Sequence, residues 1–149
     1  MSNTIVITTD GSEYSESAAE VGFEIAEKMN AAVHVLSVGD TNLTQISSIG
    51  GGPPKTKDDV TEIAAGWAAD LAATARAEGL EVEEVVRTGI PAREIADYAA
   101  EIDADMIVIG TAGRSGIERM VVGSVTNKVV RTAPAPVVTV RPDGTVDAA

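Results

Sequence analysis

The sequence has 149 residues, of which 44% are hydrophobic and 23% charged, a composition typical of one globular domain. It has no cysteine, which excludes disulfides, a thiol nucleophile and cysteine-based metal sites and favours the reducing cytoplasm. Eleven basic and 23 acidic residues give a net charge of −12, which argues against general binding to nucleic acid or to anionic membranes.

No signal peptide is expected, because the first ten residues hold no basic region followed by a long apolar stretch. No membrane-spanning helix is expected either, because no stretch of about 18 consecutive apolar residues occurs. The excess of acidic side chains, together with only four aromatic residues, is typical of a surface adapted to high salt. We therefore expect a halophilic protein of the cytoplasm.

The first half of the chain alternates between strand and helix patterns. A β-branched run predicts a strand at residues 5–9, and the turn residues 10–13 lead into a helix at 13–30 with apolar residues at three- and four-residue spacing. A second strand is predicted at 32–38. Residues 39–56 are rich in glycine, proline, serine and threonine without a sustained period, so they are expected to form a mobile loop.

The second half of the chain repeats this alternation. The predicted elements are a helix at 58–78 that stops at Gly79, a strand at 82–88, a helix at 91–100 opened by Pro91, a strand at 106–109, a helix at 125–131 and a strand at 137–140. Strands that alternate with helices predict one three-layer, doubly wound α/β domain with a parallel sheet over residues 1–149.

Several common motifs are absent from the sequence. The run at 50–56 lacks the glycine before the lysine of a phosphate loop, and its two prolines delete amides that would hold phosphate. No GxGxxG follows the first predicted strand. The single histidine, His34, lies inside a predicted strand, which favours a place in the core or on the sheet face over a catalytic or metal-binding role. We find no catalytic set and no metal site in the sequence.

A glycine-rich segment follows the strand predicted at 106–109 and leads into the last helix. The amides of Gly113 and of residues 124–126 would converge on an anion, because a helix N-terminus leaves about four donors without partners and carries about half a positive charge. Ser124 and Thr126 add hydroxyl donors, and Arg114 adds a cation. The segment 110–141 holds five basic residues and one acidic residue, which also favours an anion site. The alternative is that Ser124 caps the helix and the glycines form turns.

These residues resemble a known family. The pattern Gly110-x2-Gly113-x9-Gly123-Ser124 is similar to that of the ATP-binding subgroup of the universal stress protein family, and the segments 6–12 and 133–140 resemble that family's first and last strands. The similarity covers essentially the whole chain. It implies a Rossmann-like, adenine nucleotide alpha hydrolase-like sheet of five parallel strands in the order 3-2-1-4-5. It also implies a homodimer through the strand at 137–140.

Carried over residue by residue, the resemblance implies an ATP site, with any Mg²⁺ brought by the nucleotide. Asp10 would lie at the ribose, with the backbone around Thr8 and Val38 at the adenine. The residues implied around the phosphates are Gly110, Thr111, Gly113, Arg114, Gly123, Ser124, Val125 and Thr126. Asp10 has an alternative role as an N-cap paired with Glu13.

The sequence leaves three functional hypotheses open. The first is a homodimeric stress-response regulatory module of the cytoplasm that binds ATP or a related adenine nucleotide. The second is a slow ATP hydrolase or phosphotransferase in which Ser124 or Thr126 becomes modified; the lysine and the Mg²⁺-binding serine of a phosphate-loop enzyme have no counterpart here, so efficient hydrolysis is not implied. The third is a nucleotide-independent protein-interaction module.

Overall fold

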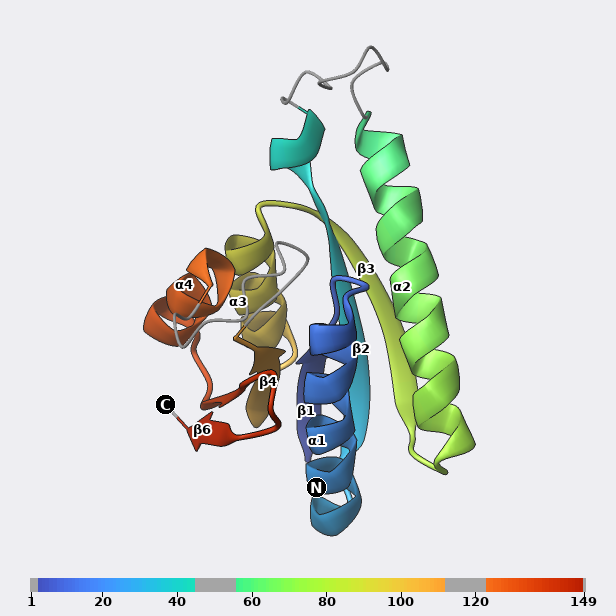
Figure 1. The fold of residues 1–149 in the computed structure, drawn as a ribbon, viewed down its shortest axis with the longest axis vertical. Helices are drawn as coiled ribbons and strands as arrows, with labels where there is room; N and C mark the ends of the chain where they lie inside the picture. Colours follow the sequence, from blue (N-terminus) through green and yellow to red (C-terminus); the bar gives the residue numbers. More distant parts are fainter. Residues whose placement is uncertain (1–2, 45–55, 112–122, 149) are drawn as a thin grey trace.

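The computed structural model describes residues 3–44, 56–111 and 123–148, and strands and helices alternate along these segments (Figure 1). The strands are β1 (Thr4–Thr8), β2 (Ala32–Asp40), β3 (Val82–Gly89), β4 (Met106–Gly110), β5 (Val137–Val140) and β6 (Val146–Ala148). The helices are α1 (Glu13–Met29), a 3-10 turn η1 (Thr41–Thr44), α2 (Lys57–Ala77), α3 (Pro91–Glu101) and α4 (Ser124–Thr132).

The strands form one sheet in the order β3-β2-β1-β4-β5-β6. The first five strands in this order are parallel, and β6 runs antiparallel to β5. The predicted α/β fold and the order 3-2-1-4-5 are therefore confirmed. The predicted number of five strands is wrong, because the short β6 pairs with the outer edge of β5. This pairing also means that the predicted dimer edge, 137–140, is not an open edge in the single chain.

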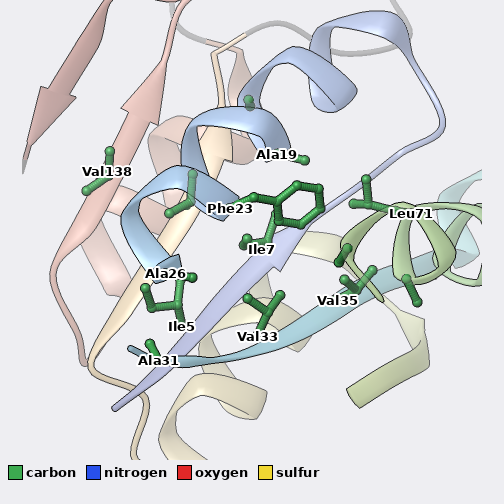
Figure 2. Close-up of a cluster of buried hydrophobic side chains, with 14 of the residues drawn as sticks. Ile5, Ile7, Ala19, Phe23, Ala26, Ala31, Val33, Val35, Leu71 and Val138 are labelled. Atoms are coloured by element: carbon green, nitrogen blue, oxygen red, sulfur yellow. The ribbon is translucent and has the colours of Figure 1, made fainter. Parts of the chain in front are cut away.

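Two hydrophobic cores cover the two faces of the sheet. Helices α1 and α2 pack on one face, where Phe23 is 1% exposed and lies beside Ile7 and near Leu71 (Figure 2). Helices α3 and α4 pack on the other face, where Ile95 and Val129 belong to the second core. Burying apolar side chains on both faces explains why the central strands β1 and β4 are almost continuously apolar. The predicted three layers are present.

The structure corrects the start of the predicted loop at 39–56. Strand β2 continues to Asp40 along the edge of β3, and η1 follows directly. Backbone hydrogen bonding to β3 keeps these residues extended despite Gly39. A side chain at Gly39 would meet the backbone of Val60 at 3.0 Å, so this close approach of α2 requires glycine. The remainder of the predicted loop, 45–55, lies outside the described residues.

Strands β1 and β4 are neighbours in the sheet although about a hundred residues separate them, with Ile7 opposite Val108. The strand order reverses here, since β2 and β3 lie on one side of this pair and β5 on the other. In an open parallel sheet, the crevice outside the carboxyl ends of such strands is the usual place for a ligand. A ligand site is therefore expected at the carboxyl ends of β1 and β4.

Candidate functional site

In the turn between β1 and α1, hydrogen bonds from Ser12 fix the position of the Asp10 carboxylate. Oδ1 of Asp10 accepts hydrogen bonds from the amide of Ser12 at 3.0 Å and from the hydroxyl of Ser12 at 2.6 Å. Oγ of Ser12 in turn accepts a hydrogen bond from the amide of Ser15, and Ser12 is the N-cap residue of α1. The alternative prediction that Asp10 is the N-cap is therefore wrong. Asp10 orients the capping serine, and its carboxylate is held at the carboxyl end of β1.

Gly11 and Trp67 make this turn rigid. Gly11 has φ +80°, a left-handed conformation that side-chain-bearing residues rarely adopt. A Cβ at Gly11 would lie 2.2 Å from Nε1 of Trp67, so the indole of α2 packs directly on the turn backbone. No role for Trp67 was predicted from the sequence. The feature that could have indicated one is that Trp67 is the single tryptophan of the chain and lies among alanines in the predicted helix at 58–78.

The end of β2 extends past the end of β1. The pairing of these two strands ends with Thr8 opposite Leu36, after which the amide of Thr9 donates to the carbonyl of Leu36 at 3.0 Å. Thr8 is buried there. In a parallel sheet the backbone groups of alternate residues face alternate neighbours, so those of Val38 face the same side as those of Leu36. That side lies beyond the paired part of β1, where the pairing with β2 has already ended.

Hydrogen bonds join the end of β4 to the start of α4. The carbonyl of Thr111 accepts from the amide of Gly123 at 2.9 Å, and Gly123 is the N-cap residue of α4. Oγ1 of Thr126 donates to the carbonyl of Gly110 at 2.6 Å, and Thr126 is 4% exposed. Gly110, Thr111, Gly123 and Thr126 are therefore brought together as predicted. The hydroxyl of Thr126, however, anchors the helix to β4, which corrects its prediction as a ligand donor.

The first turn of α4 offers amides and one exposed hydroxyl. The first intrahelical bond runs from Asn127 to the carbonyl of Gly123, so the amides of Ser124, Val125 and Thr126 precede the helical hydrogen-bond ladder. Ser124 makes no side-chain capping bond and is exposed, as is Val125. The alternative that Ser124 caps the helix is wrong. The predicted site residues Gly113 and Arg114 lie outside the described residues.

The two helix starts at this edge of the sheet differ in charge. The first turn of α1 carries Glu13 and Glu16, whereas the first turn of α4 carries no acidic residue. The partial positive charge of the α4 N-terminus is thus not offset by a carboxylate in its own first turn. The residues present at α4 therefore fit an anionic group such as a phosphate.

The other titratable cluster lies on the α3 side of the sheet. Nδ1 of His34 lies 2.6 Å from the hydroxyl of Tyr98, and the guanidinium of Arg87 lies over the Tyr98 ring. Arg87 pairs with Glu94 and Glu101; the hydrogen bond to Glu94 is the main cause of its raised pKa. Burial raises the pKa of Tyr98. His34 thus belongs to a network that joins β2, β3 and α3, in agreement with its predicted place on the sheet face.

Two features are absent from residues 3–44, 56–111 and 123–148: a metal-binding cluster and a membrane-spanning helix. No group of three or more histidine, aspartate or glutamate side chains in these segments is arranged to hold a metal ion. No helix formed by them has both the length and the apolar character needed to cross a bilayer.

The fold is a doubly wound α/β domain. At the carboxyl ends of β1 and β4, the N-terminus of α4 could accommodate an anion, because its first turn carries no acidic residue. The model of the family described as "Universal stress protein family" matches residues 1–141, and the chain belongs to this family. It is 32% identical over 137 residues to the universal stress protein MJ0531 of Methanocaldococcus jannaschii, which covers 92% of this chain and 81% of that protein. It is 29% identical over 148 residues to the universal stress protein YxiE of Bacillus subtilis, over 95% of this chain and all of that protein.

Two solved structures of similar fold are described with adenine nucleotides. One is a universal stress protein in complex with cAMP, with a TM-score of 0.68, 24% identity and coverage of 95% of this chain and 98% of that chain. The other is the universal stress protein of Archaeoglobus fulgidus in complex with dAMP, with a TM-score of 0.64, 23% identity and coverage of 93% and 97%. At these identities the likeness establishes the fold.

Proposed function

We propose that this protein is a regulatory module of the cytoplasm that binds an adenine nucleotide, with ATP as its ligand, and changes its protein contacts when occupied. The observation that carries the proposal is the meeting of Asp10, Gly110–Thr111 and the start of α4 at the carboxyl ends of the adjacent strands β1 and β4. The cAMP and dAMP named for the two structural neighbours support an adenine nucleotide as the ligand class.

Each part of the site would recognise a different part of the nucleotide. The backbone of Thr8 and Val38 would contact the adenine, and the carboxylate of Asp10 would accept hydrogen bonds from ribose hydroxyls. The amides at the start of α4 would bind the phosphates, since a helix N-terminus favours negative charge. Any Mg²⁺ would arrive with the nucleotide and balance phosphate charge near the acidic first turn of α1.

Gly123 provides the sharpest test of the phosphate assignment. Its φ of −61° and ψ of 158° suit any residue, so Gly123→Ala adds a methyl group without backbone strain. That methyl group would lie 3.2 Å from the carbonyl of Thr111, so the start of α4 and the end of β4 would have to move apart by a few tenths of an ångström. The matched control is Gly66→Ala on α2, where an added Cβ meets nothing within 4 Å.

The experiment begins with protein purified in molar salt. Denaturation followed by chromatography and mass spectrometry identifies any bound nucleotide, and calorimetry then measures the affinity for Mg-ATP. Ligand at a hundred times its Kd stabilises a folded protein by about 2.7 kcal/mol. We expect Mg-ATP to raise the Tm of the parent and of Gly66→Ala by several degrees, and to raise that of Gly123→Ala much less. A parent that carries no nucleotide and shows no Tm shift with Mg-ATP refutes the proposal and favours the interaction-module hypothesis.

Asp10 can be tested separately because the structure gives it a second role. Asp10→Asn keeps an acceptor at Oδ1 for Ser12 but loses the charge, whereas Asp10→Ala loses both. If the carboxylate binds the ribose, both variants weaken Mg-ATP binding. If it serves only the α1 cap, Asp10→Ala lowers Tm and neither variant changes the affinity.

One observation keeps a slow phosphotransferase as a second candidate. The hydroxyl of Ser124 is exposed at the start of α4, whereas that of Thr126 is buried and bonded to Gly110. Of the two hydroxyls in the first turn of this helix, that of Ser124 is therefore the one accessible to modification. Release of ADP that stops in Ser124→Ala would select this candidate over simple binding.

We also propose that the protein is adapted to high salt and forms a homodimer through β5. The net charge of −12 implies self-repulsion that salt screens, so we expect Tm to rise between 0.1 M and 2 M KCl. A dimer through β5 requires β6 to leave that edge, because β6 already pairs with it.

A further inference from the structure

Helix α2 contains a glycine that packing within the described residues does not require. Gly66 is exposed in the middle of the helix, and a Cβ added there would meet no described atom within 4 Å. Gly22, the glycine of α1, differs, because a Cβ there would lie 2.6 Å from Cδ1 of Ile7. Glycine in a helix interior is destabilising relative to alanine. Gly66 therefore lowers the stability of the helix, which favours a role in contact with another molecule.

A shallow groove of about 490 Å³ surrounds Gly66 on the exposed face of α2. Ile63 is 37% exposed and Trp67 is half-buried, so the centre of the groove is apolar. The lining residues recur at three- and four-residue spacing and span about 17 Å of the helix axis, at about 1.5 Å per residue. They are Asp59, Glu62, Ile63, Gly66, Trp67 and Asp70.

Carboxylates surround the apolar centre of the groove. Asp59, Glu62 and Asp70 are all exposed. Within the part of the chain that the structure describes, neither Glu62 nor Asp70 takes part in an ion pair. Protein interfaces commonly have an apolar centre and a polar rim, and a negative rim attracts a positive partner. The groove is therefore complementary to an apolar side chain flanked by lysine or arginine.

The missing side chain at Gly66 favours a helix as the partner. The axes of two packed helices lie about 8–10 Å apart, depending on the side chains at the contact, and glycine permits the closest approach. An exposed helix face of about three turns also suits the docking of an amphipathic helix. Nucleic acid and anionic lipid do not fit, because the carboxylates would repel their phosphates.

Trp67 connects the groove to the turn that contains Asp10. A Cβ on Gly11 would lie 2.2 Å from Nε1 of Trp67, so the indole packs against the backbone of this turn. Oδ1 of Asp10 accepts hydrogen bonds from Ser12 in the same turn. A ligand that holds the Asp10 carboxylate would therefore fix the surface on which the indole packs.

We propose that the face of α2 around Gly66 is a docking surface for another protein, and that the docked segment is a helix with one aliphatic side chain between lysines or arginines. The aliphatic side chain lies over Gly66, beside Ile63 and Trp67, and the basic side chains pair with Glu62 and Asp70. Bound nucleotide strengthens this contact, because a turn fixed by the ligand holds the indole in one position. The coupling to nucleotide rests on the proposed function, whereas the docking surface does not.

The test uses a synthetic alanine-based helix of about 18 residues, with one central leucine and lysines three and four residues to either side of it. Two control peptides replace the leucine by glutamine or all the lysines by glutamate. Because Trp67 is the single tryptophan of the chain, its emission measures the Kd of each peptide. Gly66→Leu fills the groove. Ala77→Leu is the matched control, since Ala77 is exposed about three turns further along the same side of α2, outside the groove.

We expect the leucine–lysine peptide to bind the parent and Ala77→Leu at least about ten-fold more tightly than Gly66→Leu. Both control peptides should bind the parent about ten-fold more weakly than the leucine–lysine peptide. Combining Glu62→Lys with Asp70→Lys should reverse the preference, so that the glutamate peptide binds more tightly than the lysine peptide. Gly66→Leu should keep the parent's affinity for Mg-ATP and at least its Tm, because leucine is the better helix former.

Three results would overturn the docking surface: a parent that does not bind the leucine–lysine peptide, equal binding to the parent and Gly66→Leu, or equal binding of the leucine and glutamine peptides. Light scattering after size exclusion tests a second copy of this chain as the occupant. Assemblies larger than a dimer that Gly66→Leu disperses would overturn the assignment to another protein.

Titration of the leucine–lysine peptide with and without saturating Mg-ATP tests the coupling. We expect Mg-ATP to lower the Kd of the peptide about five-fold, and the peptide to lower the Kd of Mg-ATP by the same factor. An unchanged or raised Kd in a chain that binds Mg-ATP overturns the coupling. If the parent does not bind Mg-ATP, the proposed function and the coupling fail together, and the peptide titrations without nucleotide still decide the docking surface.

Discussion

The buried hydroxyl of Thr126 offers a direct test of how the site is built. The variant Thr126→Val keeps the shape of the side chain but removes the donor to the carbonyl of Gly110. Loss of a partner for a buried polar group destabilises a protein by about 1–3 kcal/mol. For a domain of this size, 1 kcal/mol corresponds to about 2–4 °C, so we expect the Tm of Thr126→Val to fall by about 2–12 °C.

The matched control is Thr126→Ser, which keeps the hydroxyl and loses one buried methyl group, worth about 0.8 kcal/mol. Urea unfolding of the parent and both variants, with and without Mg-ATP, gives stability and affinity together. We expect Thr126→Val to be the less stable variant and to bind Mg-ATP more weakly, because the start of α4 loses its tie to β4. A Thr126→Val protein with parental Tm and reduced affinity would refute this reasoning and restore the hydroxyl as a ligand donor.

Three further predictions concern the turns. Ser12→Ala removes the N-cap of α1 and should lower the free energy of unfolding by about 1 kcal/mol in urea titrations, whereas Ser12→Thr, which keeps the hydroxyl that caps α1 and donates to Asp10, should retain most of it. In Gly11→Ala, the added methyl group would be strained by the positive φ and would clash with the Trp67 indole. This variant should therefore lower the free energy of unfolding by more than about 1 kcal/mol and shift the fluorescence emission of Trp67. Emission and stability equal to those of the parent would contradict the packing of Trp67 on the turn. The hydrogen bonds from Thr145 lower the pKa of Asp143, so their stabilisation of the hairpin is present above the ordinary carboxyl pKa and is lost as pH falls through the lowered value. The amide resonance of Thr145 should follow this titration, and in Asp143→Asn it should not.

Local sequence patterns were sufficient to predict a residue's role where that role depends on the residue's own backbone conformation. Gly79 has φ +84° just after α2, and Pro91 occupies the first turn of α3, both as predicted. The strand and helix periods depend on which side chains are apolar, so they predicted every element that contributes to the two cores. Strand β6 was missed because none of its residues belongs to either core, and a strand of three residues is too short to carry a periodic signal.

The candidate site was predictable as a set of residues but not as a set of contacts. The glycine spacing, together with the family resemblance that it supports, predicts Asp10, Gly110 and Gly123 as site residues from the sequence alone. The alternative role of Asp10 as the N-cap and the role of the Thr126 hydroxyl as a ligand donor were predicted wrongly, since the sequence offers several acceptors and donors of equal chemistry within reach. Which of them meet depends on how α1 and α4 lie against the sheet.

The alternating α/β pattern and the glycine-rich segment before the last helix can be predicted from the amino-acid sequence, because periodicity and turn chemistry act between residues close along the chain. The orientation of Ser12 by Asp10, the packing of Trp67 on Gly11 and the pairing of β6 with β5 become visible only in the folded chain. Except for the first, these contacts join separate elements, and the packing of the whole sheet selects them from many that local chemistry would allow.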